Sequence, residues 1–375
     1  MHRLSMASLA CCAALGFGSM ASAARAADND ITTSISGYGT VEGTMTGNSK
    51  YTYHDSLQDF KGANNQLDIG GQSRFGLQGN VNLGSQFSVT AQALASRIGT
   101  EDFDINTEWL FGQYEPITGL DFRLGRVVLP TFLFSDTRNV GYAQTWLRAP
   151  NEVYSLMPFK TLDGAQAIWR TSAGSVNLTS QLSYGKTSAS IDLPTVGIKD
   201  TNAQNVISLA FVAEYGDWTA RISQSRFDIP TTSPIGTHAA FTLDDKFSSA
   251  GIQYDNGTAI VLGEVARRSE NKVPGTTIML AETTSWYVAA GWRFDKLTPM
   301  IRYSTIKSVT GTFAYYKTQP TIGLALRYEA YHNVDLKLQI DRFDSHNSSA
   351  FITPDRGATP ITKVNVLSAG ADFVF

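Results

Sequence analysis

Cysteine is almost absent from this chain. Among 375 residues only Cys11 and Cys12 carry a thiol, and both lie in the first 26 residues, which have the composition of a removable leader. The rest of the chain therefore forms no disulfide bond, and catalysis by a cysteine thiolate is excluded there.

The first 26 residues combine a short basic start with a long uncharged stretch. His2 and Arg3 are followed by residues 4–24, which contain only Leu, Ala, Ser, Met, Cys, Gly and Phe. Two groups of small residues suited to cleavage occur at 21–23 and at 24–26. We expect residues 1–26 to be a secretory signal peptide and residues 27–375 to form the exported domain.

Excess positive charge and long apolar runs are also missing after residue 26. Without Arg3 and Arg25 the 30 basic residues fall to 28, against 33 acidic ones, and the resulting net charge of about −5 argues against a nucleic-acid partner. No run of about 18 apolar residues follows the leader, so no helical membrane span is expected. Two classes remain: a soluble exported protein, and a transmembrane β-barrel, whose strands give weak hydropathy signals.

Most of the chain consists of short runs in which apolar and polar residues alternate with a period of two, as in half-buried strands. Turn residues separate the runs. We count sixteen of them, at 32–46, 70–83, 86–98, 105–115, 119–128, 163–172, 174–185, 204–215, 217–228, 246–255, 257–268, 282–294, 297–308, 319–330, 333–344 and 363–375.

The connections between these runs alternate between short and long. Short links such as those at Gly84, Gly174 and Gly216 are typical of hairpin turns. An up-and-down membrane barrel has this asymmetry, with short turns at one end and long loops at the other. A soluble β-sandwich has no reason to sort its connections by length.

The alternation within single runs fits a wall between lipid and water. In residues 285–294 one face carries Trp286, Val288 and Trp292, and the other carries Ser285 and Arg293. A water-soluble antiparallel sheet would show the same alternation, but it does not predict charged or amide residues on one face of nearly every strand. We therefore expect an all-β fold, an up-and-down antiparallel transmembrane barrel of about 16 strands.

Both ends of the exported chain resemble a known family. Residues 366–375 (VLSAGADFVF) end in an aromatic residue, like the last strand of Gram-negative outer-membrane barrels, and residues 34–40 (SISGYGT) resemble the opening strand of porins. Together with the leader, the sixteen runs and one exceptional third loop, the exported chain resembles a general porin throughout. The resemblance implies an outer-membrane location, contact with lipid, a homotrimer and a third loop that folds into the barrel and narrows it.

The third long connection, residues 129–162, has the composition of such an inward-folded loop. It is rich in apolar residues that can pack against a wall, and three prolines stiffen it. Since barrels of about 16 strands leave an aqueous channel, this loop would set the size limit; the alternative is an outer loop over the mouth or in a subunit contact. The residues expected at the constriction are Asp136, Arg138, Tyr142, Trp146, Arg148, Glu152, Tyr154 and Lys160.

Basic residues of the opposite wall are expected to contribute to selectivity, because a few charges dominate the field of a narrow passage. The acidic and basic charges of the loop nearly cancel, so the sequence gives no ion preference. By alternation the lumen-facing candidates of the pore wall are Arg74, Arg123, Arg170, Arg221, Arg302 and Arg327.

Patterns for catalysis and metal binding are not found in the sequence. The four histidines after the leader all fall in connections and none has the spacing of metal ligands, so we expect no catalytic residues, no metal and no cofactor. We expect a passive diffusion channel for small hydrophilic solutes, not an enzyme. The nearest alternative is a substrate-specific channel of the same fold, which Tyr142, Trp146 and Tyr154 would favour if they line the pore. A barrel enzyme and a surface-binding barrel are less favoured.

Overall fold

The computed structural model describes residues 31–98, 102–193, 197–230, 242–270, 282–310, 318–344, 351–354 and 363–375. The expected signal peptide, residues 1–26, lies outside these described residues. Within them the chain is almost entirely strand. No helix in this part is long and apolar enough to cross a membrane.

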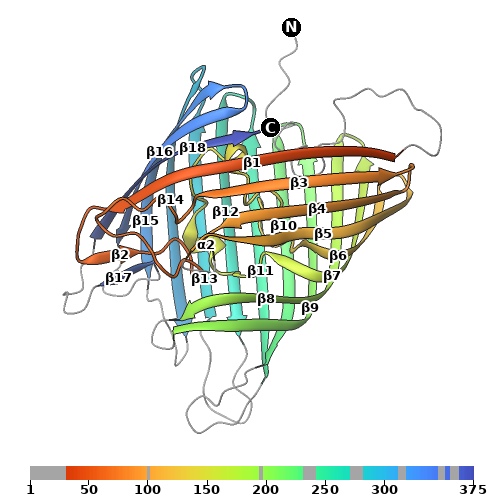
Figure 1. Ribbon diagram of the computed structural model, residues 1–375, viewed down its shortest axis with the longest axis horizontal. Coiled ribbons are helices and arrows are strands. Elements are labelled where there is room, and N and C mark those ends of the chain that lie inside the picture. The colour runs from red at the N-terminus through yellow and green to blue at the C-terminus, as the bar shows by residue number, and fades with distance from the viewer. Residues whose placement is uncertain are drawn as a thin grey trace.

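Sixteen strands close into one antiparallel barrel (Figure 1). Each barrel strand pairs with the one before and after it, and β1 pairs with both β3 and the last strand, β18. The expected sixteen-stranded, up-and-down barrel is therefore confirmed. The strands are β1 (Ile31–Thr46), β3 (Arg74–Leu83), β4 (Phe87–Ser96), β5 (Asp104–Ile117), β6 (Leu120–Val128), β7 (Thr161–Ala173), β8 (Val176–Leu193), β9 (Gly197–Tyr215), β10 (Trp218–Pro230), β11 (Thr242–Asp255), β12 (Ala259–Glu270), β13 (Glu282–Trp292), β14 (Leu297–Thr310), β15 (Gln319–Tyr331), β16 (Val334–Asp344) and β18 (Lys363–Val374).

The seam of the barrel lies between the first and last strands. Tyr38 of β1 is in register with Val374 of β18, and the pairing continues to Thr46 with Val366. The last residue extends the seam, because Gly37 N donates to Phe375 O at 2.9 Å and Phe375 N donates to Gly37 O at 3.0 Å. The described barrel thus has no free strand edge.

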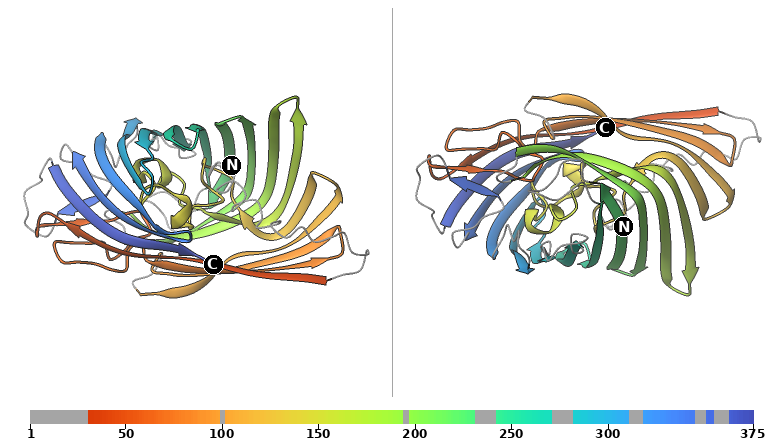
Figure 2. Two further views of the ribbon diagram at one scale, coloured as in Figure 1. Left: turned by 90° about the horizontal axis from the view of Figure 1, so that it is seen from above. Right: turned by 90° about the horizontal axis from the view of Figure 1, so that it is seen from below.

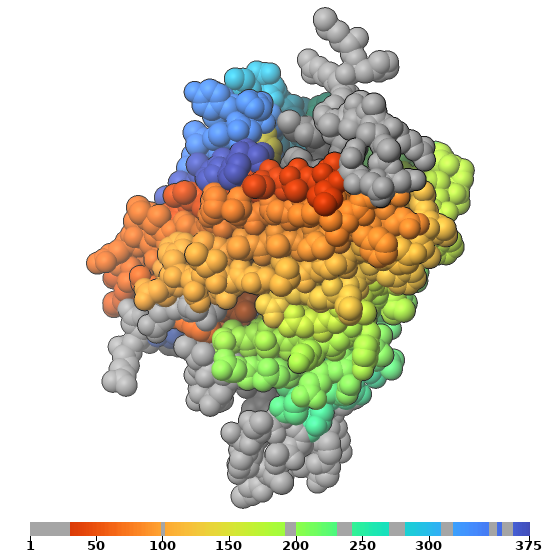
Figure 3. All heavy atoms as spheres, turned by 45° about the vertical axis from the view of Figure 1, so that its right-hand side comes forward, coloured from red at the N-terminus to blue at the C-terminus, as the bar shows by residue number. Residues whose placement is uncertain are grey.

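The outer and inner faces of the wall differ as the alternation predicts. On β13, Trp286 and Val288 are exposed, whereas Ser285 and Tyr287 between and beside them are buried. Other strands repeat this pattern, and Figure 3 shows β1 to β6, coloured red to yellow, as one continuous outer surface. An apolar outside and a polar inside suit a barrel that separates lipid from water.

Short hairpin turns connect the strands at one end of the barrel. Gly174 joins β7 to β8 and Gly216 joins β9 to β10, with φ of 63° and 56°. Glycine adopts this left-handed conformation without steric cost, and such turns match the twist of paired strands. The other end carries the long connections, among them residues 47–73 and 129–160, and the connection of β8 to β9 is an exception to the expected sorting by length.

Two of the expected loops contain strand structure. The expectation of a loop at 186–203 is wrong, because β8 and β9 continue as one long hairpin in which Ser190 Oγ donates to Asp200 Oδ1 at 2.6 Å. In the first long connection, β2 (Tyr51–Tyr53) pairs with β17 (Ile352–Pro354) in a separate two-stranded sheet. Strands of three residues are too short to show a period of two.

Candidate functional site: the loop between β6 and β7

The connection between β6 and β7 runs from Leu129 to Lys160. Its two ends lie together, because Leu129 N donates to Lys160 O at 3.0 Å. Between them are a single 3₁₀ turn, η1 (Gly141–Ala143), and one turn of helix, α2 (Asn151–Tyr154). In both views of Figure 2 the yellow segment that contains α2 lies within the ring of strands. We call residues 129–160 the inner loop.

Aromatic side chains of the inner loop pack on inward-facing rings of the wall. The ring centroid of Phe132 lies 4.4 Å from that of Tyr154 and 5.2 Å from that of Phe247 on β11. Trp146 meets Tyr287 of β13 edge to face at 5.8 Å. All five rings are buried. Aromatic pairs of this geometry stabilise a packed position beyond their buried area alone.

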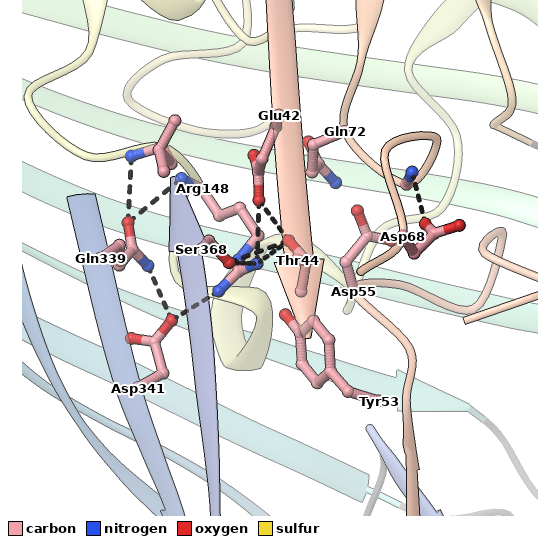
Figure 4. Close-up of polar contacts among 12 residues, drawn as sticks. Glu42, Thr44, Tyr53, Asp55, Asp68, Gln72, Arg148, Gln339, Asp341 and Ser368 are labelled. Carbon is pink, nitrogen blue, oxygen red and sulfur yellow. Dashed lines mark hydrogen bonds and ion pairs between the residues drawn. The ribbon is translucent and has the colours of Figure 1, made fainter. Parts of the chain in front are cut away.

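Arg148 ties the inner loop to three strands (Figure 4). Its Nη1 donates to Glu42 Oε1 at 3.0 Å and to Thr44 Oγ1 at 3.1 Å on β1, and to Ser368 Oγ at 2.6 Å on β18. Its Nη2 donates to Asp341 Oδ2 at 2.9 Å on β16. The side chain is only 3% exposed. Two carboxylates therefore neutralise this guanidinium, and Arg148 anchors the loop.

Glu264 of β12 holds the beginning and the end of the inner loop at once. Its Oε1 accepts a hydrogen bond from Leu133 N at 2.6 Å, and its Oε2 accepts one from the Tyr154 hydroxyl at 2.8 Å. The hydroxyl of Tyr287 donates to the same Oε2 at 3.0 Å. The Tyr154 ring thus turns its polar end towards the wall.

Two further contacts fix α2 and η1. Glu152 of α2 is fully buried, and it accepts hydrogen bonds from Ser304 Oγ of β14 at 2.8 Å and from the Thr321 hydroxyl of β15. At η1, Lys337 Nζ of β16 donates to Gly141 O at 2.8 Å. The inner loop is consequently held at both α2 and η1 by strands that follow it in the chain.

The first long connection, residues 47–73, also supports the inner loop. Asn151 Nδ2 donates to the Tyr53 hydroxyl at 2.5 Å, and the Arg148 guanidinium carbon lies 5.0 Å from the centre of the Tyr53 ring. Tyr53 also packs against Phe343 of β16, with ring centroids 5.3 Å apart. The sheet of β2 and β17 therefore contacts the same segment that the barrel holds.

A cleft lies where the inner loop meets the first connection and β3. Arg74 of β3 is one of its cations, with Nε donating to Asn139 O and Nη1 donating to Gln72 Oε1, both at 2.8 Å. No carboxylate lies within ion-pair distance of Arg74 in the described chain. The cleft is lined by Asp55, Ser56, Gln72, Arg74, Ile98, Phe134, Arg138, Asn139, Gln144, Leu147, Arg148, Ala149, Asn151, Tyr154, Ser155 and Lys160.

Two more cations of the cleft also lack a carboxylate partner among the described residues. Arg138 donates from Nη2 to Tyr154 O at 3.2 Å, and its guanidinium carbon lies 5.9 Å and 5.7 Å from the ring centres of Phe132 and Tyr154. The Lys160 amine forms no hydrogen bond or ion pair with any described residue. Uncompensated charge in the cleft is therefore mainly positive.

Burial shifts the ionisation of two cleft residues towards neutral pH. Burial, reinforced by the charge of Arg138, lowers the pKa of Lys160 to about 7. Burial, reinforced by Asp59, raises the pKa of Asp55 to about 7. Both carboxylate oxygens of Asp55 are buried without a hydrogen-bond partner in the described chain, in agreement with the upward shift.

The expected wall arginines lie on the inward face, but only some of them contact the inner loop. Arg221 Nη1 lies 3.4 Å from Asp136 Oδ2, and Arg302 donates to Arg148 O at 3.3 Å and to Asp341 Oδ1 at 2.8 Å. Both arginines therefore hold the loop rather than stand free in the lumen.

The remaining three wall arginines lie at other places. Arg327 stacks over the ring of Tyr142 at 4.9 Å, and the Tyr142 hydroxyl donates to the backbone oxygen of His332 at 2.7 Å. Arg123 and Arg170 are bonded to a glutamine and an aspartate of neighbouring strands and touch no inner-loop residue through a described hydrogen bond.

Several residues that build the site carry no signal as site residues in the sequence. Glu42, Ser368 and Asp341 lie on the polar faces of their strands, which alternation identifies, but nothing marks them as partners of Arg148. Asp55 belongs to the first long connection, and no pattern there marks it as a site residue. Folding alone brings these groups together, because their contacts join positions more than 100 residues apart.

Comparison with known proteins agrees with this architecture. A model of the Gram-negative porin family matches residues 7–348 of the chain. A search of curated protein sequences found no match.

Solved structures with the same fold come from several bacteria. The anion-selective porin from Comamonas acidovorans aligns with 92% of this chain and 100% of its own, at 13% identity and a TM-score of 0.61. Outer-membrane expressed OmpT of Vibrio cholerae covers 94% and 99%, at 12% identity and a TM-score of 0.59. The trimer form of in-vitro folded OmpT covers 92% and 100%, at 13% identity and a TM-score of 0.58. At such low identity the likeness establishes the fold alone.

Proposed function

This chain belongs to the family of Gram-negative porins, and from that premise we propose that its inner loop is the constriction of an outer-membrane diffusion channel. The family and the closed barrel support a porin channel of the bacterial outer membrane, and we infer that the protein is not an enzyme. The channel passes small hydrophilic solutes down their own gradients, and no catalytic step or cofactor takes part. Residues 1–26 direct its export and are removed.

The observation that carries the constriction is the set of contacts between the inner loop and the inward faces of distant strands. Arg148 reaches β1, β16 and β18, and Glu152 reaches β14 and β15. A loop held in this way occupies part of the cross-section of the lumen and leaves the remainder for solutes. Its fixed position makes the size limit a property of the folded protein.

The orientation of the loop aromatics favours a general sieve over a channel with a stacking site for one substrate. The ring of Trp146 packs against the wall at Tyr287, and the hydroxyl of Tyr154 is bonded to Glu264. Tyr142 is covered by Arg327. Trp146 and Tyr154 are buried and Tyr142 has the Arg327 guanidinium over its ring, so binding of one sugar-like solute by stacking on these rings is disfavoured.

A homotrimer is the assembly we propose. OmpT of Vibrio cholerae, which shares this fold, has a trimer form. The outward side chains of the present barrel are apolar on strands all around it, so a subunit contact can replace lipid without burying unpaired charge. Light scattering of the detergent-solubilised protein, corrected for bound detergent, distinguishes a trimer from a monomer by a threefold difference in protein mass.

Single-channel recording tests the constriction. The refolded protein without residues 1–26 is compared in a planar bilayer with a variant in which residues 135–155 are replaced by a short Gly/Ser linker. The linker can close the gap because Leu129 and Lys160 are already hydrogen-bonded to each other. A control variant replaces the exposed residues Ser49 and Lys50 by glycine.

Three outcomes are informative. Steady openings whose conductance grows in the loop variant and not in the control support both the channel and the constriction. Openings of unchanged conductance would contradict the constriction while leaving the channel. Absence of openings from correctly folded protein would contradict the channel itself.

A further inference from the structure

We propose that the cleft beside the inner loop is an anion-binding site, formed by Arg74, Arg138 and Lys160, which makes the channel prefer small oxyanions such as carboxylates and phosphates. This inference rests on the proposed function and specifies its solutes. The sequence alone gives no ion preference, because acidic and basic loop residues are nearly equal in number. The structure separates the charges that are neutralised from those that are not.

The three cations differ from the other basic residues of the site in having no acidic partner in the described chain. Hydrogen bonds to Asn139 O and Gln72 orient Arg74 and leave its Nη2 unbonded. Arg138 uses only Nη2, for Tyr154 O, and stacking on two rings fixes its plane. Guanidinium groups held in place with free N–H groups bind planar oxyanions well, because little side-chain freedom is lost on binding.

Arg148 lines the same cleft, yet it does not belong to the anion site. Its guanidinium is shared between Glu42 and Asp341 and is almost fully buried. Arg302 and Arg221 are likewise paired, with Asp341 and Asp136. The number of arginines in the site is therefore larger than the number that contribute uncompensated positive charge. The arginines without a carboxylate partner are the ones that contribute it.

The acidic groups near the three cations do not cancel their charge. Glu108 of β5 accepts a hydrogen bond from Asn139 Nδ2 at 2.8 Å and does not pair with a cation. Both carboxylate oxygens of Asp55 are withdrawn from solvent, and burial raises its pKa to about 7, so its negative charge is partly lost at neutral pH. The Lys160 amine is likewise only partly charged at neutral pH, because burial and Arg138 lower its pKa to about 7, so the positive charge of the cleft comes mainly from the guanidinium groups of Arg74 and Arg138.

The ligand is identified by this chemistry. Fixed donors on both sides of a cleft suit a carboxylate or a phosphate group, which accepts several hydrogen bonds, better than a neutral sugar or an alkali cation. A ligand of higher charge should dwell longer, because the attraction grows with its charge. Chloride should pass quickly, whereas phosphate should occupy the site and slow the passage of chloride.

Reversal potentials in a KCl gradient test the preference. The unmodified channel, Arg74→Gln, Arg138→Gln, Lys160→Gln and the double variant Arg74→Gln/Arg138→Gln are compared. The control is Lys50→Gln, which makes the same charge change at an exposed position outside the cleft. Arg138→Lys keeps the charge and should keep most of the preference. Inorganic phosphate is then added at constant ionic strength and the chloride current is measured.

We expect chloride to be more permeant than potassium in the unmodified channel. Each single cleft variant should lower the chloride-to-potassium ratio by about two- to fivefold, as a unit charge near the path would in partly screened water. Phosphate should reduce the current of the unmodified channel and of Lys50→Gln more than that of the double variant. Unitary conductance in symmetric KCl serves as the check that the inner loop has kept its place.

A cation-preferring or unselective channel of normal conductance would overturn the anion site and leave the proposed diffusion channel intact. So would an unchanged ratio in the cleft variants. A barrel that gives no openings at all would instead contradict the proposed function, and the two failures are therefore distinguishable.

Discussion

Arg148 of the inner loop and Asp341 of β16 form an ion pair with a nitrogen–oxygen distance of 2.9 Å, although 193 positions separate them in the chain. Both side chains are almost fully buried, and Glu42 of β1 binds the same guanidinium at 3.0 Å. Loss of one partner from a buried pair is costly because the other charge is left without compensation. This ion pair therefore fixes the inner loop to the barrel wall.

Replacement of Arg148 by methionine should release the inner loop. Glu42 would lose its cation, and the expected destabilisation is about 3–5 kcal/mol, the range for a broken buried ion pair. Single channels should show noisy openings of raised conductance, and the folded band on an unboiled gel should be lost at a lower temperature. Arg126→Met is the matched control, because Arg126 and Asp163 form a pair in which both side chains are about 40% exposed; its expected cost is only about 0–1 kcal/mol. Equal effects of the two variants would contradict the anchoring role.

Glu264 and Tyr154 should give graded effects. Tyr154→Phe removes one hydrogen bond to Glu264, with an expected cost of about 1 kcal/mol. Glu264→Leu removes the acceptor for both Tyr154 and Leu133, so it should free the loop at two places and raise the conductance further. Proteolysis of the folded protein with trypsin, followed by mass spectrometry, should reveal cleavage at Arg138 or Arg148 in Glu264→Leu before it does so in Tyr154→Phe. The reverse order would show that the loop is not held through Glu264.

Selectivity should depend on pH between about 6 and 8. The pKa of Lys160 is lowered to about 7 by burial and Arg138, and the pKa of Asp55 is raised to about 7 by burial and Asp59. Acidification from pH 8 to pH 6 therefore protonates both groups: Lys160 gains a positive charge and Asp55 loses a negative one. The cleft becomes more positive by nearly two charges, so the chloride-to-potassium permeability ratio should rise as the pH falls.

The double variant Lys160→Met/Asp55→Asn removes both titrating groups and should abolish this dependence, while the permanent charges of Arg74 and Arg138 remain. Reversal potentials at a series of pH values in one KCl gradient provide the measurement. A ratio that falls on acidification, or that varies equally in the double variant, would contradict the assignment of these two residues.

The terminal aromatic residue should contribute to closure of the barrel. The ring of Phe375 stacks on Phe75 of β3 with centroids 6.1 Å apart, across the seam at Gly37. Phe375→Ala should lower the midpoint temperature of unfolding, with about 0.5–1.5 kcal/mol from the lost ring pair. Tyr331→Ala is the control, since Tyr331 is 72% exposed on another strand and has no ring partner in the described chain. Equal midpoints of the two variants would exclude a specific role for Phe375.

The strands of the barrel could be predicted from the sequence because lipid on one side and water on the other impose a period of two along each of them. Leu336, Leu338 and Ile340 on β16 are exposed outward, and Lys337 and Gln339 between them are buried inward. The signal fails where the hairpin of β8 and β9 extends beyond the apolar band. Around Ser190 and Asp200 polar residues predominate, so the sequence predicts a loop there.

The candidate site could be located but not resolved in the sequence. Arg138 and Arg148 are the same residue type ten positions apart in the same loop, and local sequence does not separate them. Their difference lies in partners that the fold supplies: Arg148 meets Glu42 and Asp341, whereas Arg138 meets two rings and a backbone oxygen. Local composition does not indicate which residues meet across the barrel. Only the three-dimensional structure therefore shows that Arg148 anchors the loop and that Arg138 has no carboxylate partner among the described residues.

The contacts of Arg148 also have a consequence for the order of folding. Its partners lie on β1, β16 and β18, so they are found on both sides of the seam where the first strand pairs with the last. In a sheet that has not closed, the partners on β1 are separated from those on β16 and β18. Arg148 cannot bind all of them until the two ends of the chain have paired. Complete anchoring of the inner loop at Arg148 therefore requires the closed barrel.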